Sequence, residues 1–190
     1  APTPQRFALE RLDLAAAAAR LTGTGTADLA ADTLAGTAEL TAPDLAPLAP
    51  LAGLPLTGSA TLRLEAGGRP MQPELHADLA LAGLAADALS LDRLAVQAAL
   101  QPLAPIADSL PPLRLSLDAV AEGAALQGRS LTPGGRLDLT VAGGLPEAGP
   151  ATLDRLELRS PLLRLDGHGA VDPHTLAGTG RLDAALPDLA

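Results

Sequence analysis

The sequence contains no cysteine, tryptophan, tyrosine or lysine, and it has a single phenylalanine, Phe7, among its 190 residues. Without cysteine there are no disulfides, no cysteine-based zinc sites and no cysteine nucleophiles, although either a periplasmic or a cytoplasmic location remains possible. Aromatic side chains dominate most protein cores because each buries a large surface. A closed domain of this length would therefore be unusual, and an apolar surface of Leu and Ala better suits a face that contacts something fluid.

The remaining composition narrows the class of protein. Hydrophobic residues make up 47% of the chain, nearly all of them Leu or Ala, and the formal charge of −9 opposes binding to nucleic acid or to anionic membrane surfaces. A GC-rich genome explains the abundance of Arg, Ala, Gly and Pro, but it explains the missing aromatics less well. No apolar run approaches the ~20 residues that a membrane-spanning helix needs. The chain begins at Ala1 in a strand-like pattern with no evident signal peptide, so we expect a segment of a longer protein.

Alternation of apolar and polar residues is the main local signal. The 19 glycines and 18 prolines break long helices, and the remaining period-two pattern is typical of strands with one apolar face. We therefore expect an all-β fold of roughly ten to twelve, mostly antiparallel strands. The side chains that we expect on the shared apolar face are Leu62, Leu64, Leu75, Leu79, Leu81, Leu113, Leu115, Leu117, Leu137, Leu139, Val141, Leu163 and Leu165.

Three segments depart from this pattern. Residues 44–54 and 102–110 space their Leu or Ile residues by three and are interrupted by proline, which predicts short helices or irregular connections. Between residues 89 and 100 the alternation changes phase, and the simplest interpretation is a bulge or a short turn at Asp92 and Arg93.

The strand arginines Arg63, Arg114 and Arg164 are expected to face solvent or to pair with an acid on a neighbouring strand.

An internal repeat organises the chain. Residues 1–46 realign with residues 145–190, and the five-residue word Thr-Leu-Ala-Gly-Thr at 33–37 recurs, after a two-residue slip, at 175–179. We interpret residues 1–46 as the end of one β-repeat unit and residues 47–190 as the next unit, which ends in the copy at 145–190. Such a chain is expected to form a quasi-one-dimensional array in which the sheet runs on from unit to unit.

The amino-acid sequences of three strand regions resemble those of one family. The runs Leu-Asp-Arg-Leu-Glu-Leu-Arg-Ser at 153–160, Leu-Asp-Gly-His-Gly-Ala-Val at 165–171 and Gly-Thr-Gly-Arg-Leu-Asp-Ala at 178–184 are similar to those of the TamB and AsmA-like family of bridge-like lipid transfer proteins. TamB is the inner-membrane subunit of the translocation and assembly module. The resemblance covers essentially the whole chain, without the N-terminal membrane anchor or the characteristic C-terminal domain of the family.

The resemblance implies a fold, a location and partners. It implies a long, curled β-sheet with an open groove (a β-taco), in the periplasm of Gram-negative bacteria, anchored to the inner membrane in the full-length protein. It implies transfer of phospholipid between the inner and outer membranes, support of outer-membrane biogenesis and an outer-membrane barrel partner of the TamA type. No cofactor is implied, and the thirteen apolar residues given above would line the lipid groove.

The residues independently favour the same function. A sheet with one apolar face must cover that face, and if no second protein layer exists, acyl chains are the favoured cover at ~25 cal/mol per Å² removed from water. The alternative is a structural or adhesive β-solenoid segment of a secreted or surface protein, but its coils are expected to repeat every ~20–30 residues. The chain shows no nucleophile elbow and no paired carboxylates, so we expect no enzyme activity.

Two motifs are better explained as ordinary strand and turn residues than as metal or phosphate sites. His168 and His174, with Asp166 and Asp172, suggest a metal site, but the repeat places Thr24 where His168 stands, so turn and strand polar residues are expected instead. His76 is expected to be exposed on a polar strand face. The Gly-x-Gly pairs at 23–25 and 167–169 lack the full glycine pattern and the following helix of a phosphate-binding loop, and bent strands are expected there.

Overall fold

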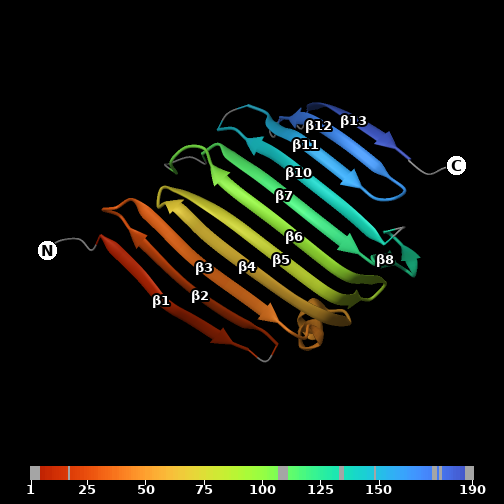
Figure 1. Ribbon diagram of the computed structural model, residues 1–190, viewed down its shortest axis with the longest axis horizontal. Coiled ribbons are helices and arrows are strands. Elements are labelled where there is room, and N and C mark those ends of the chain that lie inside the picture. Colours follow the sequence, from red (N-terminus) through yellow and green to blue (C-terminus); the bar gives the residue numbers. More distant parts are fainter. Residues whose placement is uncertain are drawn as a thin grey trace.

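A computed structural model describes residues 5–16, 18–106, 111–132, 135–147, 149–172, 175 and 177–186. These residues form a single sheet of thirteen strands, shown edge to edge in Figure 1. The strands are β1 (Arg6–Ala15), β2 (Arg20–Asp28), β3 (Thr33–Ala42), β4 (Leu56–Arg69), β5 (Gln72–Ala86), β6 (Leu89–Pro102), β7 (Leu113–Glu122), β8 (Ala125–Leu126), β9 (Arg129–Ser130), β10 (Arg136–Leu145), β11 (Ala151–Arg159), β12 (Arg164–Val171) and β13 (Gly178–Ala185).

The sheet is an open antiparallel meander. Its order is β1-β2-β3-β4-β5-β6-β7-β10-β11-β12-β13, and the two-residue strands β8 and β9 lie off this path beside β6. Most connections between consecutive strands are short, which favours this arrangement because antiparallel neighbours need only short turns. The expected all-β, antiparallel, open sheet is confirmed, with β1 and β13 as its two edges (Figure 1).

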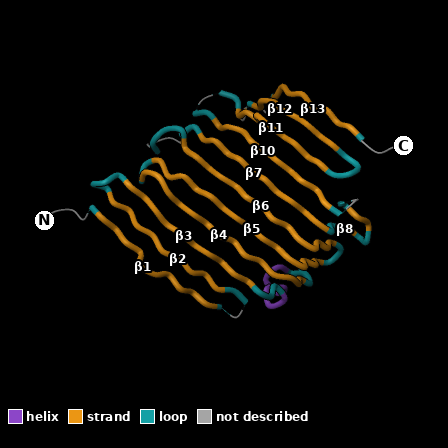
Figure 2. Tube along the Cα trace, viewed as in Figure 1, coloured by secondary structure: helices purple, strands orange, loops and turns teal. Residues whose placement is uncertain are grey.

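Short helical and irregular connections join some of the strands. In the segment predicted at 44–54, a 3₁₀ turn η1 (Ala46–Leu48) leads into a single α-helical turn α1 (Ala49–Ala52), drawn in purple in Figure 2. Gly53 ends it with a φ of 70°, a left-handed conformation that glycine adopts without strain. In the segment at 102–110, Pro102 closes β6 and residues 103–106 are irregular, while residues 107–110 lie outside the described part of the chain.

The pairing register separates the sheet into an apolar face and a polar face. Directly opposed residues point to the same side, so cross-strand partners form rows across the sheet. One row of the apolar face runs from β1 to β13 through Leu12, Gly23, Ala38, Leu64, Ala77, Ala98, Leu117, Val141, Leu156, Gly167 and Leu182. The next row is Leu14, Leu21, Leu40, Leu62, Leu79, Val96, Ala119, Leu139, Leu158, Leu165 and Ala184.

The bulge or turn expected within residues 89–100 is not found. Strand β6 passes through Asp92 and Arg93 without a break, and its register on β5 is unshifted, so the expected bulge or turn there is wrong. A register shift is found instead between β4 and β5, next to Gly58. Gly58 and Gly83 adopt φ values of 111° and 59°. A Cβ on Gly58 would lie 2.7 Å from the carbonyl oxygen of Gly83, so only glycine fits at this bulge.

Very little of the apolar face is buried. Among the described residues, the apolar side chains classed as buried, proline aside, are Ala18, Ala42, Leu45 and Leu91, and none of the described side chains is less than 2% exposed. A packed second layer would leave many residues fully buried. The described residues therefore form one layer, and its apolar side is not sealed by protein.

The first and last three strands of the sheet share an irregularity. Strand β1 shifts register on β2 between Leu9 and Leu12, and β11 shifts on β12 between Leu153 and Leu156, which are the repeat equivalents. Each shift is a β-bulge, a feature that strongly bends and twists a strand. The division into units at 1–46 and 47–190 stays a prediction, and residues 187–190 of its second copy lie outside the described residues.

Candidate functional site

The apolar face is the candidate site. Twelve of the thirteen side chains predicted to share a face lie on it, in strands β4, β5, β7, β10 and β12. The exception is Leu163, which lies in the turn between β11 and β12, where its carbonyl oxygen accepts a hydrogen bond from the backbone N–H of Ser160 at 2.8 Å. Leu64, Leu75 and Leu115 remain 42–45% exposed, so the face presents side chains that contact solvent in the protein alone.

A hollow of about 530 Å³ lies over β1 to β7 on this face. Leu9, Leu12, Leu75, Leu100 and Leu115 contribute its larger apolar side chains, and Gly23 and Gly36 leave space between them. Sequence reasoning missed Leu9, Leu12 and Leu100 as lining residues. Alternation within each strand indicated their direction, but their convergence depends on the pairing register, which brings β1 and β6 to the same hollow.

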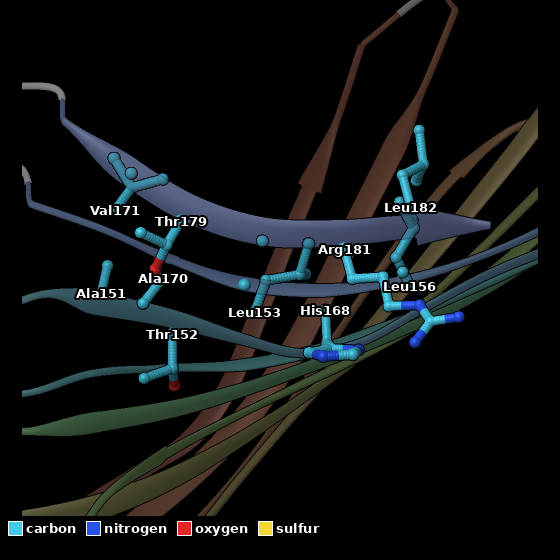
Figure 3. Close-up of a pocket in the computed structure, with 14 residues that line it drawn as sticks. Ala151, Thr152, Leu153, Leu156, His168, Ala170, Val171, Thr179, Arg181 and Leu182 are labelled. Atoms are coloured by element: carbon cyan, nitrogen blue, oxygen red, sulfur yellow. The ribbon is translucent and has the colours of Figure 1, made fainter.

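A second hollow of about 430 Å³ lies over β11 to β13. Figure 3 shows Val171 and Leu182 on one side of these strands and Thr152 and His168 on the other. The glycines of β12 and β13 are in close contact, since a Cβ on Gly169 would lie 2.7 Å from the carbonyl oxygen of Thr179. Because glycine has no side chain, these positions leave this end of the apolar face open. The leucines Leu153 and Leu156, equivalent to Leu9 and Leu12 of the first hollow, line it as well.

The polar face holds its charges in pairs. Six arginines form an ion pair with the acid two residues further along the same strand: Arg11–Asp13, Arg63–Glu65, Arg136–Asp138, Arg155–Glu157, Arg164–Asp166 and Arg181–Asp183. Residues i and i+2 share a face of a strand, which explains the spacing. Arg63, Arg114 and Arg164 are exposed to solvent, as expected, and the acids that Arg63 and Arg164 pair with are on their own strands rather than on a neighbouring one. These exposed pairs keep the face soluble and contribute little stability each.

Asp13 is the most perturbed carboxyl group of the polar face. It accepts hydrogen bonds from Arg20 on β2 and from Arg11 on its own strand, with shortest distances of 2.7 Å to each. The hydrogen bond from Arg20, followed by that from Arg11, lowers the pKa of Asp13 to about 2. The carboxylate therefore remains ionised, and it is a structural counter-ion rather than a general acid at neutral pH.

The candidate metal and phosphate motifs lie within strands or outside the described residues. His168 is exposed on the polar face opposite Arg181, while His174 is outside the described part of the chain. Within the described ranges, no group of three or more His, Cys, Asp or Glu residues is placed to hold a metal ion. The Gly-x-Gly pairs are inside β2 and β12 rather than in a loop before a helix, so they do not form a phosphate-binding loop.

Two further findings bear on identity. The helices among the described residues are all too short and insufficiently apolar to cross a membrane. Comparison of the chain with protein-family models, with curated proteins and with solved structures finds no match.

Proposed function

We propose that this chain is a non-catalytic groove segment that carries phospholipid acyl chains on its apolar face. The observation that carries the proposal is the run of uncharged rows across eleven strands, with no protein layer over them among the described residues. Leu64 and Leu115, for example, are 43% and 45% exposed in the middle of these rows. A contiguous exposed apolar patch of this extent marks a binding surface in a soluble chain.

The chemistry of the face suits a sliding hydrocarbon. Leu, Ala, Val and Gly make no directional bonds, so an acyl chain meets no fixed polar anchor as it moves along the rows. At ~25 cal/mol per Å² of apolar area removed from water, contact between an acyl chain and the half-exposed leucines is favourable along the whole face. The paired arginines and acids on the other side remain hydrated. The sheet is therefore amphipathic in the way that a lipid carrier in water requires.

The biological setting rests on the sequence resemblance to the TamB and AsmA-like family. We place the segment in the periplasm, in a longer protein anchored to the inner membrane, with an outer-membrane partner of the TamA type. Its role there is transfer of phospholipid between the two membranes in support of outer-membrane biogenesis. The geometry favours this proposal over a β-solenoid segment, because the coils of a parallel β-helix stack in parallel, whereas every ladder among the described residues is antiparallel.

The test compares arginines placed on opposite faces of the same two strands. In Leu115→Arg with Leu139→Arg, two charges stand on the apolar rows of β7 and β10, so we expect photo-crosslinking to phospholipid to be abolished, because a charge in contact with hydrocarbon is very unfavourable. The matched control, Ser116→Arg with Thr140→Arg, adds the same charges to adjacent residues on the polar face. We expect that control to crosslink lipid as the unmodified chain does.

Two readouts decide the outcome. Circular dichroism establishes that both variants keep the β-sheet, and mass spectrometry of co-purifying molecules identifies the lipid. Undiminished crosslinking in a folded Leu115→Arg, Leu139→Arg variant would show that lipid does not lie on the apolar face. Equal loss in both variants would show that added positive charge, rather than its position, causes the effect.

A further inference from the structure

We infer that the outer edge of β13, the side away from β12, is a docking edge for an antiparallel strand with the chemistry of β4, an alternating strand that carries Arg and Glu two residues apart. Among the described residues, β13 is the last strand of the sheet and pairs with β12 alone (Figure 1). All eight of its residues are exposed. A strand in this position presents unpaired backbone N–H and C=O groups to any strand that matches it.

The edge of β13 is regular, unlike the other edge of the sheet. Its register on β12 runs without a shift from Gly178 to Ala185, and no proline interrupts it. Strand β1, at the opposite edge, contains a bulge between Leu9 and Leu12. Bulges, prolines and lysines are the usual means by which proteins block strand addition at an edge. The described part of β13 has none of them, so it is the better template.

Charges on the polar face select the incoming strand. Asp183 stands directly opposite Asp166, which in turn is opposite Glu157, so an acidic row reaches the edge. Two residues along, Arg181 stands opposite His168. Like charges that face each other across strands are destabilising, and opposite charges are stabilising. The edge therefore favours a strand that places a cation beside Asp183 and an anion beside Arg181.

Strand β4 has this pattern and already pairs with the counterpart of β13. In the first three strands, Gly25 of β2 pairs with Gly36 of β3; in the last three, Gly169 of β12 pairs with Gly180 of β13. Strand pairing therefore aligns Gly36 with Gly180, two residues further on than the repeated words at 33–37 and 175–179 do, and the pairing is used for the register. On the other side of β3, Arg63 of β4 is opposite Glu39 and Glu65 is opposite Thr37. Transferred to β13, the same register sets Arg63 beside Asp183, Glu65 beside Arg181 and Leu64 beside Leu182.

This register also continues the apolar face. Leu64 would extend the row that ends at Leu182, and Leu62 would extend the row that ends at Ala184. A strand shifted by two residues keeps the faces but brings Arg63 opposite Arg181, a like-charge pair. The charges thus distinguish between two registers that the apolar pattern alone leaves equivalent.

The experiment uses the whole 190-residue chain and a labelled synthetic peptide with the sequence of residues 56–69. Fluorescence anisotropy at low ionic strength should show saturable binding that weakens with added salt, because exposed ion pairs are screened. Hydrogen exchange measured with and without peptide should show new protection in residues 178–185 and none in residues 6–15. Protection at 6–15 instead would assign docking to the wrong edge and overturn the inference.

The matched control is a peptide of identical composition in which the two charges are exchanged, Arg63→Glu with Glu65→Arg. We expect it to bind about tenfold more weakly, since two favourable cross-strand pairs become unfavourable. The reciprocal exchange in the chain, Arg181→Asp with Asp183→Arg, lies on exposed side chains, and circular dichroism checks its fold. This variant should restore binding of the exchanged peptide.

Equal binding of both peptides to the unmodified chain would overturn the charge-selected register, and absence of any binding would overturn the docking edge itself. The assay contains no lipid. Its failure is therefore distinguishable from failure of the proposed lipid-carrying function.

Discussion

On the apolar face, Leu, Ala, Val and Gly follow one another across eleven strands, whereas on the polar face Arg stands beside Asp or Glu along most of the same strands. The polar side chains find their partners within the sheet: Arg136, for example, pairs with Asp138 of its own strand at 2.7 Å. The apolar side chains have no such partner layer among the described residues, since Leu64 and Leu115 remain nearly half exposed.

This difference shows which face depends on something outside the sheet. A charged surface in water is satisfied by hydration and by weak ion pairs. An apolar surface of this size is satisfied only by removal from water. The following predictions test whether the apolar face is open in solution, whether its close glycine contacts hold the sheet in shape, and whether the polar face alone responds to pH.

The largest expected effect comes from comparing a covered leucine with an open one. Leu91 is 8% exposed and Leu64 is 43% exposed. Truncation of a buried leucine to alanine typically costs 2–5 kcal/mol, because contacts are lost and a cavity remains, so we expect about 2–3 kcal/mol for Leu91→Ala. For Leu64→Ala, on the open face, we expect less than about 1 kcal/mol.

Chemical denaturation of delipidated protein measures both free energies of unfolding. A cost for Leu64→Ala as large as that for Leu91→Ala would mean that the apolar face is covered in solution by protein. With phospholipid bound, the losses of unfolding free energy for Leu64→Ala and Leu91→Ala should become more similar if lipid lies over Leu64.

A second comparison places alanine on each face in turn. A Cβ on Gly143, in an apolar row, would lie 2.3 Å from the carbonyl oxygen of Thr152, whereas a Cβ on Gly67, on the polar face, would meet nothing within 4 Å. We expect Gly143→Ala to lower the free energy of unfolding by about 1–3 kcal/mol, because β10 and β11 would have to separate. We expect Gly67→Ala to be neutral or to stabilise by up to about 1 kcal/mol. Thermal and chemical denaturation check both values.

The smallest expected effect concerns pH. The pKa of Asp13 is lowered from 3.8 to about 2 in the folded chain by its hydrogen bonds with Arg20 and Arg11. Because the folded pKa lies below the unfolded one, this group stabilises the fold above about pH 4, and the contribution is lost as the pH falls towards 2. Asp13→Asn should therefore flatten the dependence of stability on pH between about pH 4 and pH 2.

High salt should reduce the difference between Asp13→Asn and the unmodified chain, since both partners of Asp13 are exposed arginines. Lipid binding should change little over the same pH range, because no titratable residue stands in the apolar rows. A pH dependence of stability that Asp13→Asn leaves intact would assign the acid sensitivity to other carboxylates.

The amino-acid sequence by itself determined which side chains share a face. A strand exposes alternate residues to opposite sides, so Leu62, Leu64, Leu137 and Leu139 could be assigned to one face from spacing alone. Gly and Pro marked where strands end, and the meander follows because short connections favour antiparallel neighbours. Leu163 was misplaced because alternation does not show where β12 begins.

Only the tertiary structure decided how the strands align with one another. The meeting of Leu9 with Leu75 and Leu100 around one hollow, the bulge at Gly58 and the pairing of Arg63 with Glu65 rather than across strands all depend on register and side-chain rotamers. Register is set by how the apolar patterns of neighbouring strands match and by turn geometry, so the pattern of one strand by itself does not contain that information. The sequence therefore defined two unlike faces, and the pairing of the strands joined one of them into a continuous apolar surface.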